Sequence, residues 1–270
     1  MSRAVSVERL RDGARERMLD AAAVEEPLQV RVDREPFAVL MRTPGDDCHL
    51  TAGFLVSERI VSHPADVASI EPCVDSSHPD RSNVIDVALA PGARVAAEGR
   101  LADRRKVVAN ASCGLCGRVT VESLQVEAPY VGASWTLARE RAATLPSRLR
   151  VRQAAFEETG GLHAAGVFSA DGTCDAIAED IGRHNAVDKV VGRLFLAARL
   201  PCPDRALVVS GRASFEIVQK AFLAGIPIIA AVSAPSSLAI DLAEAAGITL
   251  LGFVRDGGFN VYTHGHRIVE

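Results

Sequence analysis

The sequence predicts a mixed α/β protein, and two stretches of the chain carry this prediction. Residues 206–262 alternate short apolar strands with amphipathic helices, the pattern of a parallel sheet covered by helices. Residues 26–89 contain short runs with apolar side chains at every second position, which indicates half-buried strands of a second, smaller unit. The composition fits such a fold, since 48% of the 270 residues are hydrophobic and 24% are charged.

The N-terminal part is expected to form a tail followed by the smaller unit. Residues 1–22 are rich in charged side chains and lack an apolar segment, so we expect a mobile tail and no secretory signal. Residues 23–110 are expected to form a small mixed α/β domain. Its predicted elements are strands at 27–32, 37–42 and 84–89, a turn at Thr43-Pro44-Gly45-Asp46-Asp47 and a helix at 49–57.

The C-terminal part carries the clearest pattern. The predicted strands are 206–209, 228–232, 248–253 and 261–262, and the predicted helices are 136–156, 213–223 and 238–246, the last with Gly247 as its C-cap. The uncharged run at 221–240 is long enough to span a membrane, but Gly225, Pro227 and Pro235 interrupt it. We therefore expect a buried strand between two helices there, and no membrane partner.

Charge and cysteine usage exclude other classes of protein. Thirty basic and 34 acidic residues give a net charge of −4, and aromatic residues make up 4% of the chain. General nucleic-acid binding requires a basic surface and often aromatic stacking platforms, so no nucleic-acid partner is expected. Without an export signal, the six cysteines are expected in a reducing cytoplasm and not in a disulfide framework.

Small, polar and cationic residues follow the predicted parallel strands, at the edge where such sheets bind ligands. They are Ser210-Gly211-Arg212, Ser233-Ala234-Pro235-Ser236 and Arg255-Asp256-Gly257-Gly258. Helix N-termini and the two arginines can bind phosphate groups, so these strand ends suit a phosphate-bearing ligand. The same residues are also compatible with ordinary strand-to-helix turns, in which Arg255 pairs with Asp256.

The segment Cys113-Gly114-Leu115-Cys116 has four interpretations. Half of a zinc site needs further ligands, for which the chain offers only the isolated His163 and His184. A thioredoxin-like motif is expected near the N-terminus in a βαβ unit. A buried structural pair leaves the flanking glycines unexplained. A sulfur-handling thiolate is favoured by nearby cations, among them Arg118 and Arg104-Arg105-Lys106.

A second dense group of polar residues spans Glu179 to Lys189. If this segment is helical, Asp180, His184 and Asp188 are spaced four residues apart and share one face. The cluster then indicates either a functional site or a solvated helix with salt bridges. His163, between small residues, is compatible with a simple turn.

Several of these motifs together resemble a known family. In order along the chain they are Ser-Cys-Gly-Leu-Cys-Gly at 112–117, Gly-Gly-Leu-His-Ala-Ala at 160–165, Glu-Asp-Ile-Gly-Arg-His-Asn-Ala-Val-Asp-Lys at 179–189 and Ser-Gly-Arg-Ala-Ser-Phe-Glu at 210–216. They closely resemble the formate dehydrogenase accessory sulfurtransferase family, FdhD. The resemblance covers residues 24–264, nearly the whole chain.

The resemblance implies a sulfurtransferase that acts through a cysteine persulfide. Such proteins take sulfur from a cysteine desulfurase and pass it to the molybdenum bis(molybdopterin guanine dinucleotide) cofactor before its insertion into the catalytic subunit of formate dehydrogenase. The persulfide-carrying cysteine corresponds to Cys113, with Cys116 as its neighbour. The alternative is a non-catalytic chaperone that only binds the cofactor.

The cofactor-binding segment of the family corresponds to six consecutive residues near the C-terminus. Together with the strand ends, the expected cofactor-binding residues are Phe253, Val254, Arg255, Asp256, Gly257, Gly258, Ser210, Gly211, Arg212 and Ser236. Gly258 stands where many members carry a second basic residue. GDP is expected to mimic the guanine dinucleotide end of the cofactor, and no structural metal is expected.

The resemblance also implies the architecture. Residues 136–270 are expected to form a cytidine-deaminase-like, three-layer domain with a mixed sheet, joined to the smaller domain by a CxxC loop and linker at 111–135. The protein is expected to be a homodimer. Deamination is not expected, because Ala164 and Ala165 follow His163 and no proline precedes Cys113.

Overall fold

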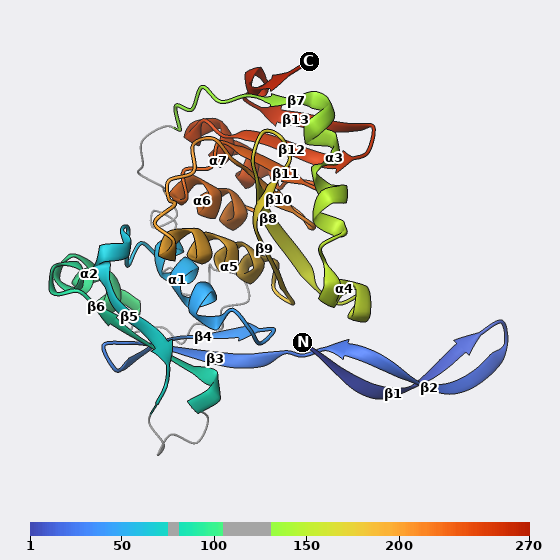
Figure 1. Ribbon diagram of the computed structural model, residues 1–270, viewed down its shortest axis with the longest axis horizontal. Coiled ribbons are helices and arrows are strands. Elements are labelled where there is room, and N and C mark those ends of the chain that lie inside the picture. Colours follow the sequence, from blue (N-terminus) through green and yellow to red (C-terminus); the bar gives the residue numbers. More distant parts are fainter. Residues whose placement is uncertain (75–80, 105–130) are drawn as a thin grey trace.

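A computed structural model of the protein describes residues 1–74, 81–104 and 131–270 (Figure 1). The described part of the chain is a mixed α/β protein, as the sequence predicts. A six-stranded sheet with helices on both faces forms the larger part, a four-stranded sheet forms the smaller part, and an N-terminal hairpin extends away from both.

The six-stranded sheet positions the ligand edge. Its strand order is β13-β12-β11-β10-β8-β9. The three central strands β10 (Ala206–Val209), β11 (Ile228–Ala231) and β12 (Thr249–Arg255) run parallel. The outer strands β8 (His163–Phe168), β9 (Cys174–Asp180) and β13 (Gly258–Thr263) each pair antiparallel to a neighbour, so the sheet is mixed. The strands predicted at 206–209, 228–232 and 248–253 are confirmed.

Helices cover both faces of this sheet, because successive side chains of a strand point to opposite sides. Leu207 and Val209 of β10 lie in one hydrophobic core with side chains of α5 (Arg183–Leu196), α6 (Phe215–Leu223) and α7 (Ser237–Ala246). Ala206 and Val208 face the other core, with residues of α3 (Arg139–Arg150). The helix predicted at 136–156 is divided, since a turn separates α3 from the short helix α4 (Ala154–Thr159).

The smaller sheet has the order β4-β3-β6-β5. Its strands are β3 (Glu26–Val32), β4 (Glu35–Arg42), β5 (Val67–Pro72) and β6 (Val84–Leu89), and α2 (Pro91–Arg104) follows β6. Helix α1 (Asp47–Ser57) packs directly against α5 of the larger part. A Cβ atom on Gly53 would lie 1.9 Å from the carbonyl oxygen of Asp188, so the two helix backbones touch. One hydrophobic core therefore contains side chains of both parts.

The segment predicted to be a mobile tail is a β-hairpin of β1 (Ser2–Arg11) and β2 (Ala14–Ala23). Asp12 and Gly13 connect the strands with φ angles of 52° and 78°. An Asp-Gly pair at positive φ is the turn that two-residue hairpin loops favour. This local hairpin signal lies within the charged N-terminal residues.

Short elements complete the fold. Strands β7 (Leu137–Ala138) and β14 (Ile268–Val269) pair with each other. Short 3-10 turns lie at Pro64–Asp66, Arg81–Asn83 and Gly265–Arg267. Among the described residues, no helix has the length and apolar character needed to cross a membrane. The uncharged run at 221–240 contains the buried strand β11 between α6 and α7, as predicted.

Candidate functional site

A pocket of about 840 Å³ opens at the carboxyl ends of the three parallel strands. Ser210 follows β10, Val232 follows β11, and Arg255 ends β12, and all three line the pocket. Leu149 of α3 and Phe156 of α4 form the opposite wall. The pocket thus lies at the edge where ligands of parallel α/β sheets bind.

Four of the ten predicted cofactor-binding residues line this pocket: Ser210, Val254, Arg255 and Asp256. The other six do not line it. Gly211 packs against the imidazole of His163, since a Cβ atom at Gly211 would be 3.3 Å from His163 Nδ1. Ser236 is the N-cap of α7 and accepts a hydrogen bond from the backbone N–H of Ala239. Arg212, Phe253, Gly257 and Gly258 complete this group.

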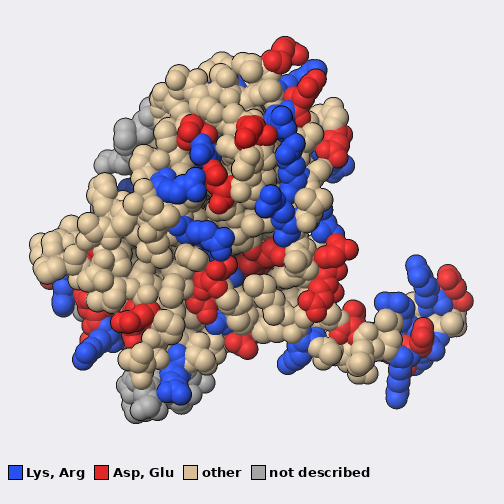
Figure 2. Space-filling view, in the orientation of Figure 1, with Lys and Arg blue, Asp and Glu red and all other residues tan. Residues whose placement is uncertain are grey.

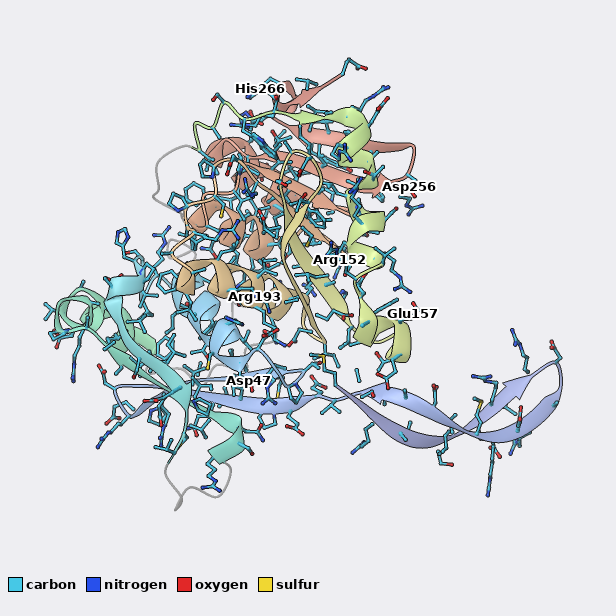
Figure 3. All side chains as sticks on the ribbon, in the orientation of Figure 1. Asp47, Arg152, Glu157, Arg193, Asp256 and His266 are labelled. Carbon is cyan, nitrogen blue, oxygen red and sulfur yellow. The ribbon has the colours of Figure 1, made fainter. Side chains whose placement is uncertain are left out.

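Asp256 and Arg255 have separate surroundings. Both carboxylate oxygens of Asp256, which is labelled in Figure 3, lie within 2.8 Å of Ser147 Oγ, so this contact links the β12–β13 turn to α3. The Arg255 side chain is exposed and makes no hydrogen bond or ion pair with any residue in the described ranges. The alternative in which Arg255 pairs with Asp256 is therefore wrong, and the Arg255 guanidinium is available to a ligand.

The backbone at the end of β12 is irregular. The pairing with β13 shifts register between Gly252 and Arg255, and Phe253 adopts a left-handed φ of 54°. Such bulges re-aim side chains and concentrate near binding sites. Here the bulge leaves Val254 buried in the pocket wall and Phe253 42% exposed beside it.

His163 lies in the wall between the large pocket and a smaller one. The smaller pocket, of about 170 Å³, lies at the N-terminus of α5 and is also lined by Arg183 and His184. Burial, together with these two neighbours, lowers the pKa of His163, whereas Asp180 acts in the opposite direction. A neutral imidazole can accept a hydrogen bond from a ligand.

Positive charge gathers beside the pocket although the protein is net acidic. Figure 2 shows a band of Lys and Arg side chains where Figure 1 places α3, and acidic side chains where it places α4. The arginines of α3 are Arg139, Arg141, Arg148 and Arg150. A local field of this kind favours anionic ligands independently of net charge.

The polar cluster at 179–189 does not form one helical face. Asp180 ends β9, whereas α5 begins at Arg183 after the extended N-cap Gly182. The prediction that Asp180, His184 and Asp188 share a face is therefore wrong, because the strand continues through Asp180. The solvated helix is also wrong, since these three side chains are buried.

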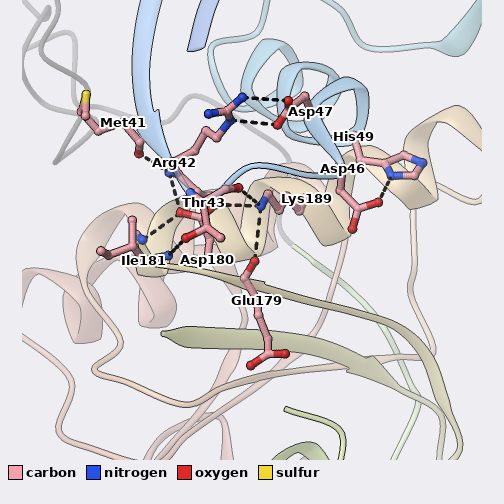
Figure 4. A network of polar contacts seen from close by, with 12 residues as sticks. Met41, Arg42, Thr43, Asp46, Asp47, His49, Glu179, Asp180, Ile181 and Lys189 are labelled. Carbon is pink, nitrogen blue, oxygen red and sulfur yellow. Dashed lines mark hydrogen bonds and ion pairs between the residues drawn. The ribbon is translucent and has the colours of Figure 1, made fainter. Parts of the chain in front are cut away.

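Asp180 joins the two parts of the molecule (Figure 4). Its carboxylate lies 2.8 Å from Lys189 Nζ and accepts hydrogen bonds from the backbone N–H groups of Thr43 and Gly182. Lys189 in turn donates to the carbonyl oxygen of Thr43 at 2.9 Å. The network therefore fixes the loop after β4 to the start of α5.

A second buried pair continues this connection. Lys220 Nζ of α6 donates to both carboxylate oxygens of Asp188 at 2.7 and 2.8 Å, and Ser57 of α1 donates to the same carboxylate. Buried charges require this kind of complete pairing. The Asp188–Lys220 pair and the Ser57 hydrogen bond thus hold α1, α5 and α6 together, and neither buried ion pair lines the large pocket.

His184 links α5 to α6. Its Nε2 lies 3.2 Å from Ser214 Oγ and 3.6 Å from a carboxylate oxygen of Glu216. Burial alone would raise the pKa of Glu216, but hydrogen bonds from His184 and Ser214 outweigh it and lower that pKa to about 2. Glu216 thus remains ionised in the first turn of α6, where a negative charge is favourable.

A comparison with known protein families shows to which family the chain belongs. Residues 23–269 match the model of the FdhD/NarQ family. The chain belongs to the FdhD/NarQ family. The resemblance predicted from the sequence motifs is thereby confirmed.

Individual FdhD/NarQ relatives extend over nearly the whole chain. A protein from Streptomyces coelicolor named sulfur carrier protein FdhD is 48% identical over 267 residues, which cover 96% of this chain and 93% of that protein. A protein of the same name from Anaeromyxobacter sp. (strain K) is 48% identical over 266 residues, 96% of this chain and 91% of that protein. A crystal structure from Desulfotalea psychrophila, assigned as a formate dehydrogenase accessory protein, superposes with a TM-score of 0.78 at 25% identity and covers 99% of each chain.

The two predicted catalytic cysteines of this FdhD/NarQ member, Cys113 and Cys116, lie outside the described residues. The four described cysteines are free. Burial raises the pKa of Cys48 and Cys174 and raises that of Cys202 to about 11, and Cys73 is buried beside Arg31. Raised pKa values leave the first three thiols largely protonated and unreactive at neutral pH.

The described ranges contain no group of three or more His, Cys, Asp or Glu side chains that could hold a metal ion.

The sequence prediction missed the wall formed by α3 and α4. Arg150, Gln153 and Phe156 line the pocket, although the sequence indicated only a helix there. No local motif marks them, because their role depends on the sheet edge that they face.

Proposed function

We propose that this FdhD/NarQ protein is a sulfur carrier that takes persulfide sulfur from a cysteine desulfurase and transfers it to the molybdenum bis(molybdopterin guanine dinucleotide) cofactor before insertion into formate dehydrogenase. Relatives at close to half identity named sulfur carrier protein FdhD support the sulfur-carrying part. The pocket at the carboxyl ends of β10, β11 and β12 is the observation that carries the cofactor-binding part.

The pocket has the composition expected of a site for a large, phosphate-bearing ligand. Its volume of about 840 Å³ lies within the roughly 300–1,000 Å³ of small-molecule sites. Leu149, Leu162 and Val254 supply apolar walls. The Ser210 hydroxyl already accepts a hydrogen bond from the N–H of Ala164 at 2.8 Å, so its own proton is free for a ligand. The Arg255 guanidinium can pair with a phosphate.

Sulfur loading is an exchange reaction at Cys113. The Cys113 thiolate attacks the outer sulfur of the donor persulfide, a new S–S bond forms on Cys113, and the donor cysteine leaves as a thiolate. One sulfur atom moves without net oxidation or reduction. The Cys116 thiolate can then attack the inner sulfur of the Cys113 persulfide, so that a disulfide forms and sulfide leaves. The two thiols supply the two electrons that convert sulfane sulfur to sulfide.

Mass spectrometry tests the carrier role directly. After incubation with a cysteine desulfurase and cysteine, added sulfur is expected on Cys113 and not in Cys113→Ala. Cys48→Ala, which removes a half-buried thiol with a raised pKa, is the matched control and should load normally.

Activity in cells separates the carrier from the chaperone. Cells whose only copy is Cys113→Ala should lack formate dehydrogenase activity. Normal activity in those cells would overturn the carrier role and favour the non-catalytic cofactor-binding chaperone.

A further inference from the structure

The N-terminal hairpin of β1 and β2 forms an arm that leaves the body of the molecule (Figure 1). Each strand has ten residues, which at about 3.3 Å per residue makes the arm roughly 33 Å long. The base of the arm is fixed to the body. Ser2 Oγ donates a hydrogen bond to the carboxylate of Glu158, and a Cβ atom at Gly161 would lie 3.5 Å from the Cβ atom of Ala23. Beyond this base the arm continues the direction of β3 and extends into solvent (Figure 1).

The arm has apolar side chains and backbone groups that it cannot cover by itself. Val5, Val7 and Met18 share one face, because Val5 and Val7 are two residues apart and Val7 lies directly opposite Met18. In the described ranges β1 and β2 pair only with each other, so the outer edge of each strand is open. A two-stranded hairpin is at best marginally stable in water, and an open edge is a template for a further strand. We therefore expect the arm to pair with a third strand.

A second open edge, of matching character, belongs to the smaller sheet. Its outermost strand, β4, pairs only with β3 among the described residues. The eight residues of β4 include an uncharged run from Pro36 to Met41, in which Val39 is 42% exposed and Met41 is 38% exposed. These two side chains share a face, because they are two residues apart like Val5 and Val7 of the arm. Proteins usually cover or charge such an apolar edge, so β4 is also expected to have a partner strand.

The far end of the arm and the β3–β4 hairpin have opposite net charge. Residues 9–17, at the far end of the arm, contain four arginines and two acidic residues. Residues 25–47, which contain β3 and β4, have six acidic and three basic residues. Because the arm points away from its own β4, the strand that completes it must come from another molecule (Figure 1). A second copy of the chain offers an open, apolar edge of similar length and opposite charge.

We propose that β1 of the arm pairs with the β4 edge of a second copy, and that the arm of the second copy pairs with the first in return. The smaller sheet then continues through the arm, and Val5 and Val7 lie beside Val39 and Met41 on one face. The exchange is symmetric and covers both β4 edges, so it closes as a dimer. Each copy contributes two ten-residue arm strands and one edge strand of eight, close to the roughly 20–30 residues that each partner of a standard interface supplies. The proposal assigns a contact surface to the expected homodimer and does not depend on the proposed function.

Analytical sedimentation of full-length variants tests the pairing. Val7→Lys and Val39→Lys each place a charge in the shared apolar face, and neither position belongs to the hydrophobic core of the described residues. We expect each variant to weaken the dimer roughly 10- to 150-fold, the factor that corresponds to burial of one valine side chain. Ser6→Lys is the matched control, because Ser6 is exposed on the opposite face of the arm, and this variant should dimerise like the wild type. Circular dichroism should show that all three variants remain folded.

Chemical cross-linking of mixed variants locates the contact. Val7→Cys mixed with Val39→Cys is expected to form a covalent dimer with a bismaleimide reagent, above the level given by the wild-type cysteines. Val7→Cys mixed with Val95→Cys, which lies on α2 at a position that is 73% exposed, should stay at the wild-type level. A monomeric wild type would overturn the proposal, as would a dimer that either lysine variant leaves intact. Equal cross-linking of the two mixtures would also overturn it.

Discussion

Two regions of the molecule contain the polar residues that the sequence singles out, and they differ in how those residues are bonded. In the cluster at 179–189 the buried charges Asp180, Asp188 and Lys189 have all found partners within the fold. In the pocket at the strand ends, the side chains of Arg255 and Gln153 have no hydrogen-bond or ion-pair partner among the described residues. Dense charge in a sequence can therefore mark a structural connection, whereas a ligand site is marked by polar groups that the fold leaves unsatisfied.

The largest expected effect concerns the structural cluster. Lys189→Met leaves the Asp180 carboxylate buried without its cation, and breaking a buried ion pair from one side typically costs about 3–5 kcal/mol. We expect a loss of that size in the free energy of unfolding, measured with urea. GDP binding to the protein that remains folded should be retained.

Arg193→Met on the same helix is the matched control. Arg193 also bonds to the loop after β4, through Asp46, but its side chain is 39% exposed. Exposed ion pairs contribute about 0–1 kcal/mol, so this variant should unfold nearly like the wild type. Equal losses of stability in Lys189→Met and Arg193→Met would show that burial does not determine how much the Asp180 network contributes to the free energy of unfolding.

The second prediction concerns Arg255 in the pocket, where we expect a loss of ligand affinity with almost no loss of stability. Arg255→Ala removes an exposed guanidinium that bonds to no described residue, so the free energy of unfolding should change by less than about 0.5 kcal/mol. GDP binding should weaken by roughly 1.5–3 kcal/mol, the usual contribution of a hydrogen bond to a charged group. Calorimetry on this variant and on Arg152→Ala, whose arginine is exposed and does not line the pocket, gives the comparison. Unchanged GDP affinity in Arg255→Ala would place the phosphates elsewhere.

The sequence predicted the central elements well because their signals are local. The strand at 206–209 and the helix at 238–246 were predicted from apolar runs and from Gly247 as the C-cap, which the structure places in a left-handed conformation. Ser210 and Arg255 line one pocket, and the sequence predicted that they lie near each other because strand ends in a parallel sheet converge on one edge. The strands β8 and β9, with many small residues, were not predicted, and neither was the hairpin of β1 and β2.

What the sequence could not provide is contact between distant segments. Asp180 was interpreted with its neighbours at 184 and 188, whereas in the structure it bonds to Thr43, 137 residues away in the chain. Gln153 and Phe156 gave no signal at all, because they become pocket residues only when α3 packs over the sheet. Pairing of this kind is a property of the tertiary structure and has no period or cap to reveal it.

The smallest expected effect belongs to His163, which borders both regions. Burial and the neighbours Arg183 and His184 lower its pKa below the ordinary 6.5, so below pH 6.5 the unfolded chain binds more protons at this position than the folded protein. The contribution of His163 to stability is therefore complete above pH 6.5 and is lost as pH falls through the lower pKa of the folded state. When the pH is lowered below 6.5, the free energy of unfolding should fall less in His163→Gln than in the wild type. His266→Gln, which removes an exposed imidazole near the C-terminus, should not (Figure 3).

The same proton should act with opposite sign on ligand binding. A protonated His163 adds positive charge to the wall of the large pocket, so the affinity for GDP in the wild type, relative to His163→Gln, should rise as pH falls. If stability decreases and relative GDP affinity increases over the same pH range, one titrating group affects both the folded state and the bound ligand. If the ratio of wild-type to His163→Gln affinity is constant over that range, His163 does not face the bound phosphates and belongs with the structural cluster at 179–189.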